Sequence, residues 1–221
     1  MQLPVALYHS ISTEADPRFR RWVVDPGRFE DQMATLARAR YQALTVSEYA
    51  AWIRGSLVIT APPVVVTFDD GFADFRTTAL PIMRKYGIRS TLYLSTGYID
   101  GTSTWLAGEG EGERRMLTWG DVAAVAGDDV EIGAHGRSHR EFDTLPLEEA
   151  VQDVAQSKWA IEARLGRPIR TMAYPHGYST RGLRNEVAAM GFAAACGVKH
   201  AHSSESDDLY SLARVIIGNE V

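Results

Sequence analysis

Cysteine, clusters of basic residues and long apolar runs are all scarce in this chain of 221 residues. The single cysteine, Cys196, excludes a disulfide within the chain and is typical of proteins from a reducing compartment. Lys and Arg total 23 against 28 Asp and Glu and form no block, so the basic footprint of a nucleic-acid-binding protein is missing. No apolar run is long enough to span a bilayer, which predicts no membrane span.

The first residues, MQLPVALYHS, also lack the basic start and long apolar core of a secretory signal peptide. We therefore expect a cytoplasmic protein, unless an export signal lies upstream of Met1. The hydrophobic share of 45% is enough for a sizeable core. Since no repeat or linker divides the sequence, we expect one catalytic domain over residues 1–221, and its oligomeric state is not indicated.

Short β-type runs alternate with helical patterns along nearly the whole chain, which predicts a parallel α/β protein, either a barrel or an open sheet. Asp25 before Pro26 is expected to cap a helix, and Thr118 with Asp121 has the spacing of a capping box. Residues 101–115 and 199–208 are expected to be loops. The expected strands are 4–9, 41–46, 62–68, 90–96, 129–134, 169–175, 192–198 and 212–217, and the expected helices are 25–40, 47–55, 72–87, 117–127, 146–166 and 179–191.

Imidazole and carboxylate side chains follow four of the expected strands. Because the carboxyl ends of parallel strands share one rim, where the chemistry of such folds collects, these side chains are expected to converge. The residues are His9, the pair Asp69 and Asp70, the pair His135 and His139, and His176.

The segment HGRSH places His135 and His139 four residues apart, on one face of a helical turn. Two imidazoles and one carboxylate suit a catalytic divalent metal with an open coordination position. This predicts a metal site of Asp70, His135 and His139, with Asp69 left free as a base and Gly71 allowing the turn. A metal would also offset the repulsion between the two adjacent carboxylates.

Each signal has a plainer explanation when taken alone. A lone His-x₃-His is often a solvated pair, adjacent aspartates often form a turn, and His200 and His202 lie in a polar stretch that we expect to be exposed. Two histidines and a carboxylate also bind non-haem iron in oxygenases, but those sites usually lie on an all-β fold. A dehalogenase-type phosphatase would have spaced rather than adjacent aspartates. The combination of residues at strand ends favours the metal site.

These segments resemble the polysaccharide deacetylases of the NodB-homology type, family 4 of the carbohydrate esterases. TFDDGF (67–72) matches the first family motif and EIGAHGRSH (131–139) the second, while LYHSIS (7–12), MLTW (116–119) and AYPHG (173–177) look like the branch with the poly-N-acetylglucosamine deacetylases. The resemblance covers nearly the whole chain. It implies a distorted (β/α) barrel of about seven units and a metal-dependent de-N-acetylase that releases acetate from an amino sugar or an N-acetylglucosamine-containing polysaccharide.

The resemblance also implies roles for individual residues. Asp69 would be the catalytic base, and Asp70, His135 and His139 would hold the metal, expected to be Zn, with Co, Ni, Mn and Fe as alternatives. The general acid would be His9, because the histidine of the usual C-terminal motif is missing here. The backbone N–H of His176, in the third motif, would contact the oxyanion. Further substrate contacts would come from Tyr174, Pro175 and Trp119. Other aromatic residues that could stack on a sugar are Tyr98, Trp105 and Tyr178.

One departure concerns the third motif, where Ala173 stands in place of the arginine that steadies the base in typical members. Arg137 and Arg214 are the candidates for that role. The altered motif keeps two alternatives open: a metal-dependent hydrolase of a non-sugar amide or imide, and a degenerate carbohydrate-binding domain.

Overall fold

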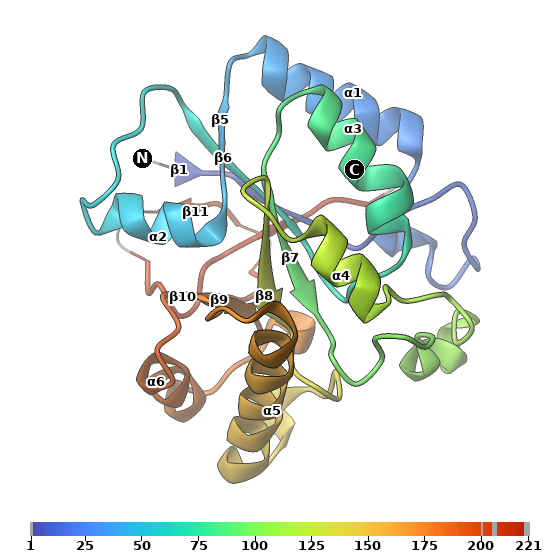
Figure 1. Ribbon diagram of the computed structural model, residues 1–221, viewed down its shortest axis with the longest axis vertical. Helices are drawn as coiled ribbons and strands as arrows, with labels where there is room; N and C mark the ends of the chain where they lie inside the picture. Colours follow the sequence, from blue (N-terminus) through green and yellow to red (C-terminus); the bar gives the residue numbers. More distant parts are fainter. Residues whose placement is uncertain (1, 200, 205–206, 219–221) are drawn as a thin grey trace.

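A curled parallel sheet runs through the centre of the computed structural model, which describes residues 2–199, 201–204 and 207–218 (Figure 1). The strand order is β10-β9-β8-β7-β6-β2-β12, and β5 pairs with the first part of β6. With helices around it, this sheet confirms the distorted (β/α) barrel. The strands are β2 (Val5–Tyr8), β5 (Gln42–Leu44), β6 (Pro63–Phe68), β7 (Ser90–Leu94), β8 (Val130–Ala134), β9 (Thr171–Ala173), β10 (Ala194–Cys196) and β12 (Val215–Ile216).

Two small sheets lie beside the main one. The antiparallel pair of β1 (Gln2–Leu3) and β11 (Ser203–Ser204) is formed by segments from opposite ends of the chain. The parallel pair of β3 (Ser10–Ile11) and β4 (Val23–Val24) holds the chain that leaves β2. β3 therefore fixes the backbone directly after His9.

Two of the helices begin at their expected caps. Asp25 accepts hydrogen bonds from the backbone N–H groups of Gly27 and Arg28, and Thr118 and Asp121 form the expected capping box. In Figure 1, α1 and α3 lie side by side, and α5 extends below the sheet next to α6. The helices are α1 (Pro26–Arg38), α2 (Val46–Ile53), α3 (Leu80–Lys85), α4 (Trp119–Val125), α5 (Leu147–Leu165) and α6 (Arg181–Ala189).

Several segments differ from the expectation, among them 199–208, which was expected to be a loop but contains β11. In place of one helix over 72–87, a wider π-helical turn, η2 (Phe75–Ala79), precedes α3. Pro81 explains the change, because it lacks an N–H and its ring clashes with the carbonyl four residues earlier in a regular α-helix. The expected loop 101–115 contains a short 3₁₀ helix, η3 (Thr104–Glu109).

Alternate residues of the central strands face two different apolar layers. On β6, Val64 and Val66 pack against the outer helices, whereas Val65 belongs to a second cluster inside the curl of the sheet. Successive side chains of a strand point to opposite faces, so the inward series 65, 67, 69 continues to Asp69.

The same alternation brings further functional side chains to the inside. On β8 the inward series passes through Gly133 to His135, and on β2 it passes through Leu7 to His9. A Cβ at Gly133 would lie 2.5 Å from a ring carbon of Tyr93, so only glycine leaves room for that buried ring. The period of two along each strand therefore delivers Asp69, His135 and His9 to one end of the barrel.

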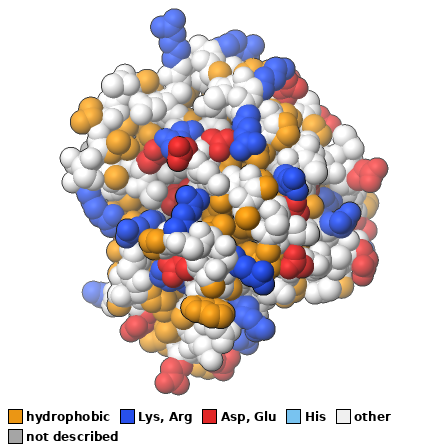
Figure 2. All heavy atoms as spheres, in the orientation of Figure 1, with side chains coloured by type: hydrophobic (Ala, Val, Ile, Leu, Met, Phe, Trp, Pro, Cys, Tyr) orange, Lys and Arg blue, Asp and Glu red, His pale blue; other side chains and the backbone are white. Residues whose placement is uncertain are grey.

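No helix of the described residues is long and apolar enough to cross a membrane. On the face drawn in Figure 2, acidic and basic side chains are interspersed rather than gathered into regions of one sign.

Candidate active site

Asp69 and Asp70 are brought to one place by a change of backbone conformation after β6. Asp70 has φ +74° and Gly71 has φ +92°, both in the left-handed region. Left-handed backbone is unfavourable for a residue with a Cβ and is concentrated at functional sites. The turn breaks the alternation of the strand, so both carboxylates are buried at the same rim. The sequence assigned this turn to Gly71 alone, whereas Asp70 itself carries part of it.

The expected metal ligands come together, although residues 135–139 form a bend with left-handed Gly136 and His139 and not the expected helical turn. One ligand atom from each of Asp70, His135 and His139 lies within 4.8 Å of the others. The Nε2 atoms of His139 and His135 are 3.0 Å and 3.4 Å from Asp70 Oδ1. The Nδ1 of His135 lies 2.8 Å from the carbonyl oxygen of Ala173, and since a carbonyl can only accept, this nitrogen carries the proton. The Nε2 of His135 therefore carries the lone pair, which is free to bind a cation beside the carboxylate, as in metal-binding histidines.

The donor atoms fit a cation. Asp70 Oδ1 is buried and forms no hydrogen bond within the described part of the chain, although two imidazole nitrogens face it. A buried carboxylate oxygen without a partner is costly, and a divalent cation among one carboxylate and two neutral imidazoles would remove that cost. These three residues therefore form a suitable place for a divalent metal.

Arg214, and not Arg137, is the cation beside Asp69. Its Nη1 and Nη2 atoms each lie 2.7 Å from one oxygen of the Asp69 carboxylate, and both side chains are almost fully buried. Its remaining N–H groups donate to the carbonyl oxygen of Gly197 and the hydroxyl of Thr67. Arg137 is exposed at the rim. The barrel thus replaces the missing third-motif arginine with one from just before β12.

These contacts set the charge state of the carboxylates. Burial acts to raise the pKa of Asp69, but the charge of Arg214 and the nearby His135 outweigh it, so this pKa lies below its usual value. Burial acts in the same direction on Asp70, and His139 and His135 lower its pKa well below the usual range. Both groups are therefore ionised at neutral pH.

His9 lines the same cavity as the second-motif histidines, and its ring packs against Trp22 with centroids 4.9 Å apart. Burial lowers the pKa of His9, while the charges of Asp70 and Asp69 act to raise it. Its Nδ1 is buried and has no hydrogen-bond partner among the described residues. The orientation of this ring is therefore set by packing and by the adjacent backbone.

The third motif contributes less to the cavity surface than expected. His176 faces the cavity in a left-handed conformation, φ +57°, with its ring 4.9 Å from that of His139. Tyr174 is fully buried and donates its hydroxyl hydrogen to the carbonyl of Tyr210, and Pro175 is buried as well. Neither lines the cavity, so both support the turn that presents His176.

The side chains enclose a cavity of about 560 Å³, a size typical of small-ligand sites. Of the aromatic candidates, Trp105 and Tyr178 line it, whereas Trp119 lies at the start of α4 under the guanidinium of Arg164. Several residues that line the cavity carry no signal in the sequence, because segment 17–24 has no strand or helix pattern and the charged residues belong to no motif. These walls are Phe19, Arg21, Trp22, Glu109 and Glu141.

Two further histidines, His200 and His202, were expected to be exposed. His202 is exposed, and His200 lies outside the described residues.

An Asp-His-His cluster beside an arginine-held aspartate, at the carboxyl ends of a curled parallel sheet, is the arrangement expected of the NodB-homology class. The chain belongs to the polysaccharide deacetylase family, whose model matches residues 59–195. Over 214 residues it is 25% identical to YxkH of Bacillus subtilis (strain 168), by name a polysaccharide deacetylase, and this match covers 97% of the chain and 71% of that protein.

Two solved structures share the fold. The deacetylase PplD of Streptococcus pyogenes, solved in complex with acetate, has a TM-score of 0.85 and 21% identity, covering 99% of this chain and 93% of PplD. IcaB from Ammonifex degensii has a TM-score of 0.83 and 20% identity with the same coverage.

Proposed function

We propose that the protein is a metal-dependent de-N-acetylase that hydrolyses the N-acetyl group of an amino sugar or of an N-acetylglucosamine-containing polysaccharide. The observation that carries this proposal is the pairing of two units: the Asp70-His135-His139 cluster and the adjacent Asp69 held by Arg214. The first unit suits a catalytic cation with an open position, and the second supplies an ionised base beside it.

Amide hydrolysis needs an activated water, a stabilised oxyanion and a protonated leaving group. A divalent cation held by Asp70, His135 and His139 would lower the pKa of water and polarise the acetyl carbonyl. Asp69 accepts the proton of the attacking water, and Arg214 keeps its carboxylate ionised and oriented.

Two further groups complete the reaction. The backbone N–H of His176 faces the developing oxyanion, a type of contact worth about 3 kcal/mol. His9, which lines the same cavity, donates a proton to the departing nitrogen, so that acetate and a free amine are released.

A carbohydrate substrate is supported by the family and by the cavity walls. Trp105, Trp22 and Tyr178 give the cavity aromatic surface, which packs well against the apolar faces of a pyranose ring. The acetate in the PplD structure is the product that this reaction would release.

The test is acetate and amine release from N-acetylglucosamine oligomers by the zinc-loaded protein, with a cyclic imide as the competing substrate. Wild type should release equal amounts of both products, and chelation should abolish the reaction. Asp69→Asn should keep its metal and lose turnover by about 10²–10⁴-fold, because only the base is removed. Hydrolysis of the imide without acetate release would replace this proposal with the non-sugar amide alternative.

A further inference from the structure

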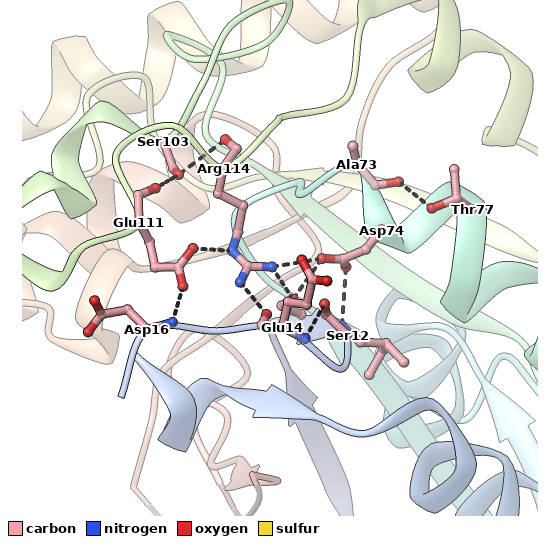
Figure 3. A network of polar contacts seen from close by, with 11 residues as sticks. Ser12, Glu14, Asp16, Ala73, Asp74, Thr77, Ser103, Glu111 and Arg114 are labelled. Atoms are coloured by element: carbon pink, nitrogen blue, oxygen red, sulfur yellow. Dashed lines mark hydrogen bonds and ion pairs between the residues drawn. The ribbon is translucent and has the colours of Figure 1, made fainter. Parts of the chain in front are cut away.

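Arg114 joins three segments that each carry part of the catalytic cavity. Figure 3 shows its guanidinium between Glu111, Asp74 and Glu14. Its Nε lies 3.0 Å from Glu111 Oε2, its Nη1 lies 2.9 Å from Ser10 Oγ and 3.4 Å from Asp74 Oδ2, and its Nη2 donates to the carbonyl of Glu14 at 2.9 Å. The side chain is only 12% exposed.

Asp74 holds the same N-terminal segment from the other side. Its Oδ2 accepts the hydroxyl hydrogen of Ser10 at 2.6 Å, and its Oδ1 accepts the backbone N–H of Ile11 at 3.2 Å. Asp74 precedes η2, where an aspartate normally caps its own helix, yet its side chain makes no capping bond. The carboxylate is used instead to anchor the chain directly after His9.

The loop that bears η3 is bound into the same network. Glu111 Oε1 accepts the backbone N–H of Asp16 at 2.6 Å, and the hydroxyl of Ser103 donates to the carbonyl of Glu111 at 2.6 Å. Between these contacts, η3 carries Trp105, Leu106 and Glu109 into the cavity wall. The hydrogen bonds of Arg114 therefore connect two parts of the cavity wall: residues 10–16, which follow His9, and residues 103–111, which contain η3.

The network also packs against apolar side chains. The guanidinium carbon of Arg114 lies 5.4 Å and 5.7 Å from the ring centres of Phe19 and Phe72. These rings belong to a small apolar cluster with Leu106, and Trp22, which contacts His9, packs against it. An arginine held between carboxylates and aromatic rings keeps little freedom, so its position is well defined.

We propose that Arg114 and Asp74 are positioning residues that fix His9 and η3 around the reacting group. The proposal rests on the proposed function, in which His9 is the general acid. Since no hydrogen bond within the described residues orients the Nδ1 of His9, the Ser10 anchor and the Trp22 contact set where its ring lies. Loss of the contact between Asp74 and Ser10 should therefore impair proton donation by His9 and leave metal binding unchanged.

A double-mutant cycle with His9 tests this role. Asp74→Ala should lower amide turnover by about 10-fold when His9 is present and by less than about twofold in the His9→Ala background, because the group being positioned is then missing. Ser10→Ala, which removes only the hydroxyl link, should show the same dependence on His9 at smaller size. Equal effects in both backgrounds would overturn the proposal.

Hydrogen–deuterium exchange gives a readout that needs no activity. Arg114→Ala should speed exchange in residues 10–16 and 103–111 together and leave β7 and β8 unchanged. The matched control is Lys158→Ala on α5, which also removes a partly buried cation with a carboxylate partner, Glu162, and an aromatic neighbour, Phe192; it should not alter these segments.

If the wild-type protein releases no acetate, the proposed function fails. Hydrogen–deuterium exchange of Arg114→Ala still shows whether the network holds residues 10–16 and 103–111 in place. Unchanged exchange in both segments of Arg114→Ala would refute that part in either case.

Discussion

Arg214 and Asp69 form a two-point ion pair inside the barrel, with both nitrogen–oxygen distances at 2.7 Å and the two residues 145 positions apart in the sequence. The pair joins the residue before β12 to the carboxylate that follows β6. The pair supplies the cation that the third motif lacks. It also fixes the Asp69 carboxylate relative to β12, the last strand of the sheet.

Removing the cation alone should destabilise the fold. Arg214→Met leaves the carboxylate of Asp69 buried without its partner, so the free energy of unfolding should fall by about 3–5 kcal/mol in urea titrations. The double variant Asp69→Asn/Arg214→Met should recover part of that loss, because no unpaired charge stays buried. A double variant as unstable as the sum of the two single ones would contradict this account of the pair.

Metal binding should depend on the three ligands and not on their neighbours. Asp70→Asn and His135→Ala should lose bound divalent metal after dialysis, as measured by plasma mass spectrometry. His176→Ala should keep it, although its ring contacts that of His139. Full metal occupancy in both ligand variants would show that the assignment is wrong.

The general acid can be separated from its rival by the leaving group. His9→Ala should lower turnover of an N-acetyl amide by about 10²–10⁴-fold and retain metal. The defect should shrink for an activated acetyl ester, whose leaving group needs less protonation. If His176→Ala shows this dependence and His9→Ala does not, the two roles are exchanged.

Tyr178 should contribute to substrate binding with little effect on the fold. Its side chain lines the cavity and the residue is 56% exposed, so Tyr178→Ala removes little buried surface. Loss of an aromatic contact worth about 0.5–1.5 kcal/mol should raise KM by about 2–10-fold at nearly constant kcat. Tyr178→Phe, which keeps the ring, is the matched control, and an equal KM rise in both variants would assign the effect to the hydroxyl.

Glu131 should make stability fall as pH rises above 4.5. It accepts hydrogen bonds from the backbone of Ser47 and from the hydroxyls of Thr91 and Thr171, and burial raises its pKa above the usual value of 4.5. The folded state therefore keeps this proton to higher pH than the unfolded chain. The stabilisation is complete below pH 4.5 and declines toward the raised pKa.

Denaturation of wild type and Glu131→Gln between pH 4 and 8 checks this prediction. The variant should lack that part of the decline, because glutamine does not titrate. Parallel stability curves for the two proteins would exclude a raised pKa at Glu131.

The sequence determined most of the elements and the candidate metal-binding residues, because both were read from local patterns and short motifs. Asp25 and Thr118 cap their helices through residues two or three positions away, and the period of two along a strand already directs His135 inward. The family motifs identified Asp70, His135 and His139, and the structure brings them together.

Contacts between distant segments were decided only by the tertiary structure. Arg214 and Arg137 were equal candidates for the cation beside Asp69, and Trp119 was expected at the site but packs on α5 instead. No local sequence pattern predicts the contact between Arg114 and Ser10, because the two residues are distant in the sequence and meet only in the folded barrel. The motifs determine which side chains can react. How those side chains are held is decided by the packing of segments that carry no motif. The reason is that the contacts of a side chain across a curled sheet depend on the register and curvature of the whole barrel.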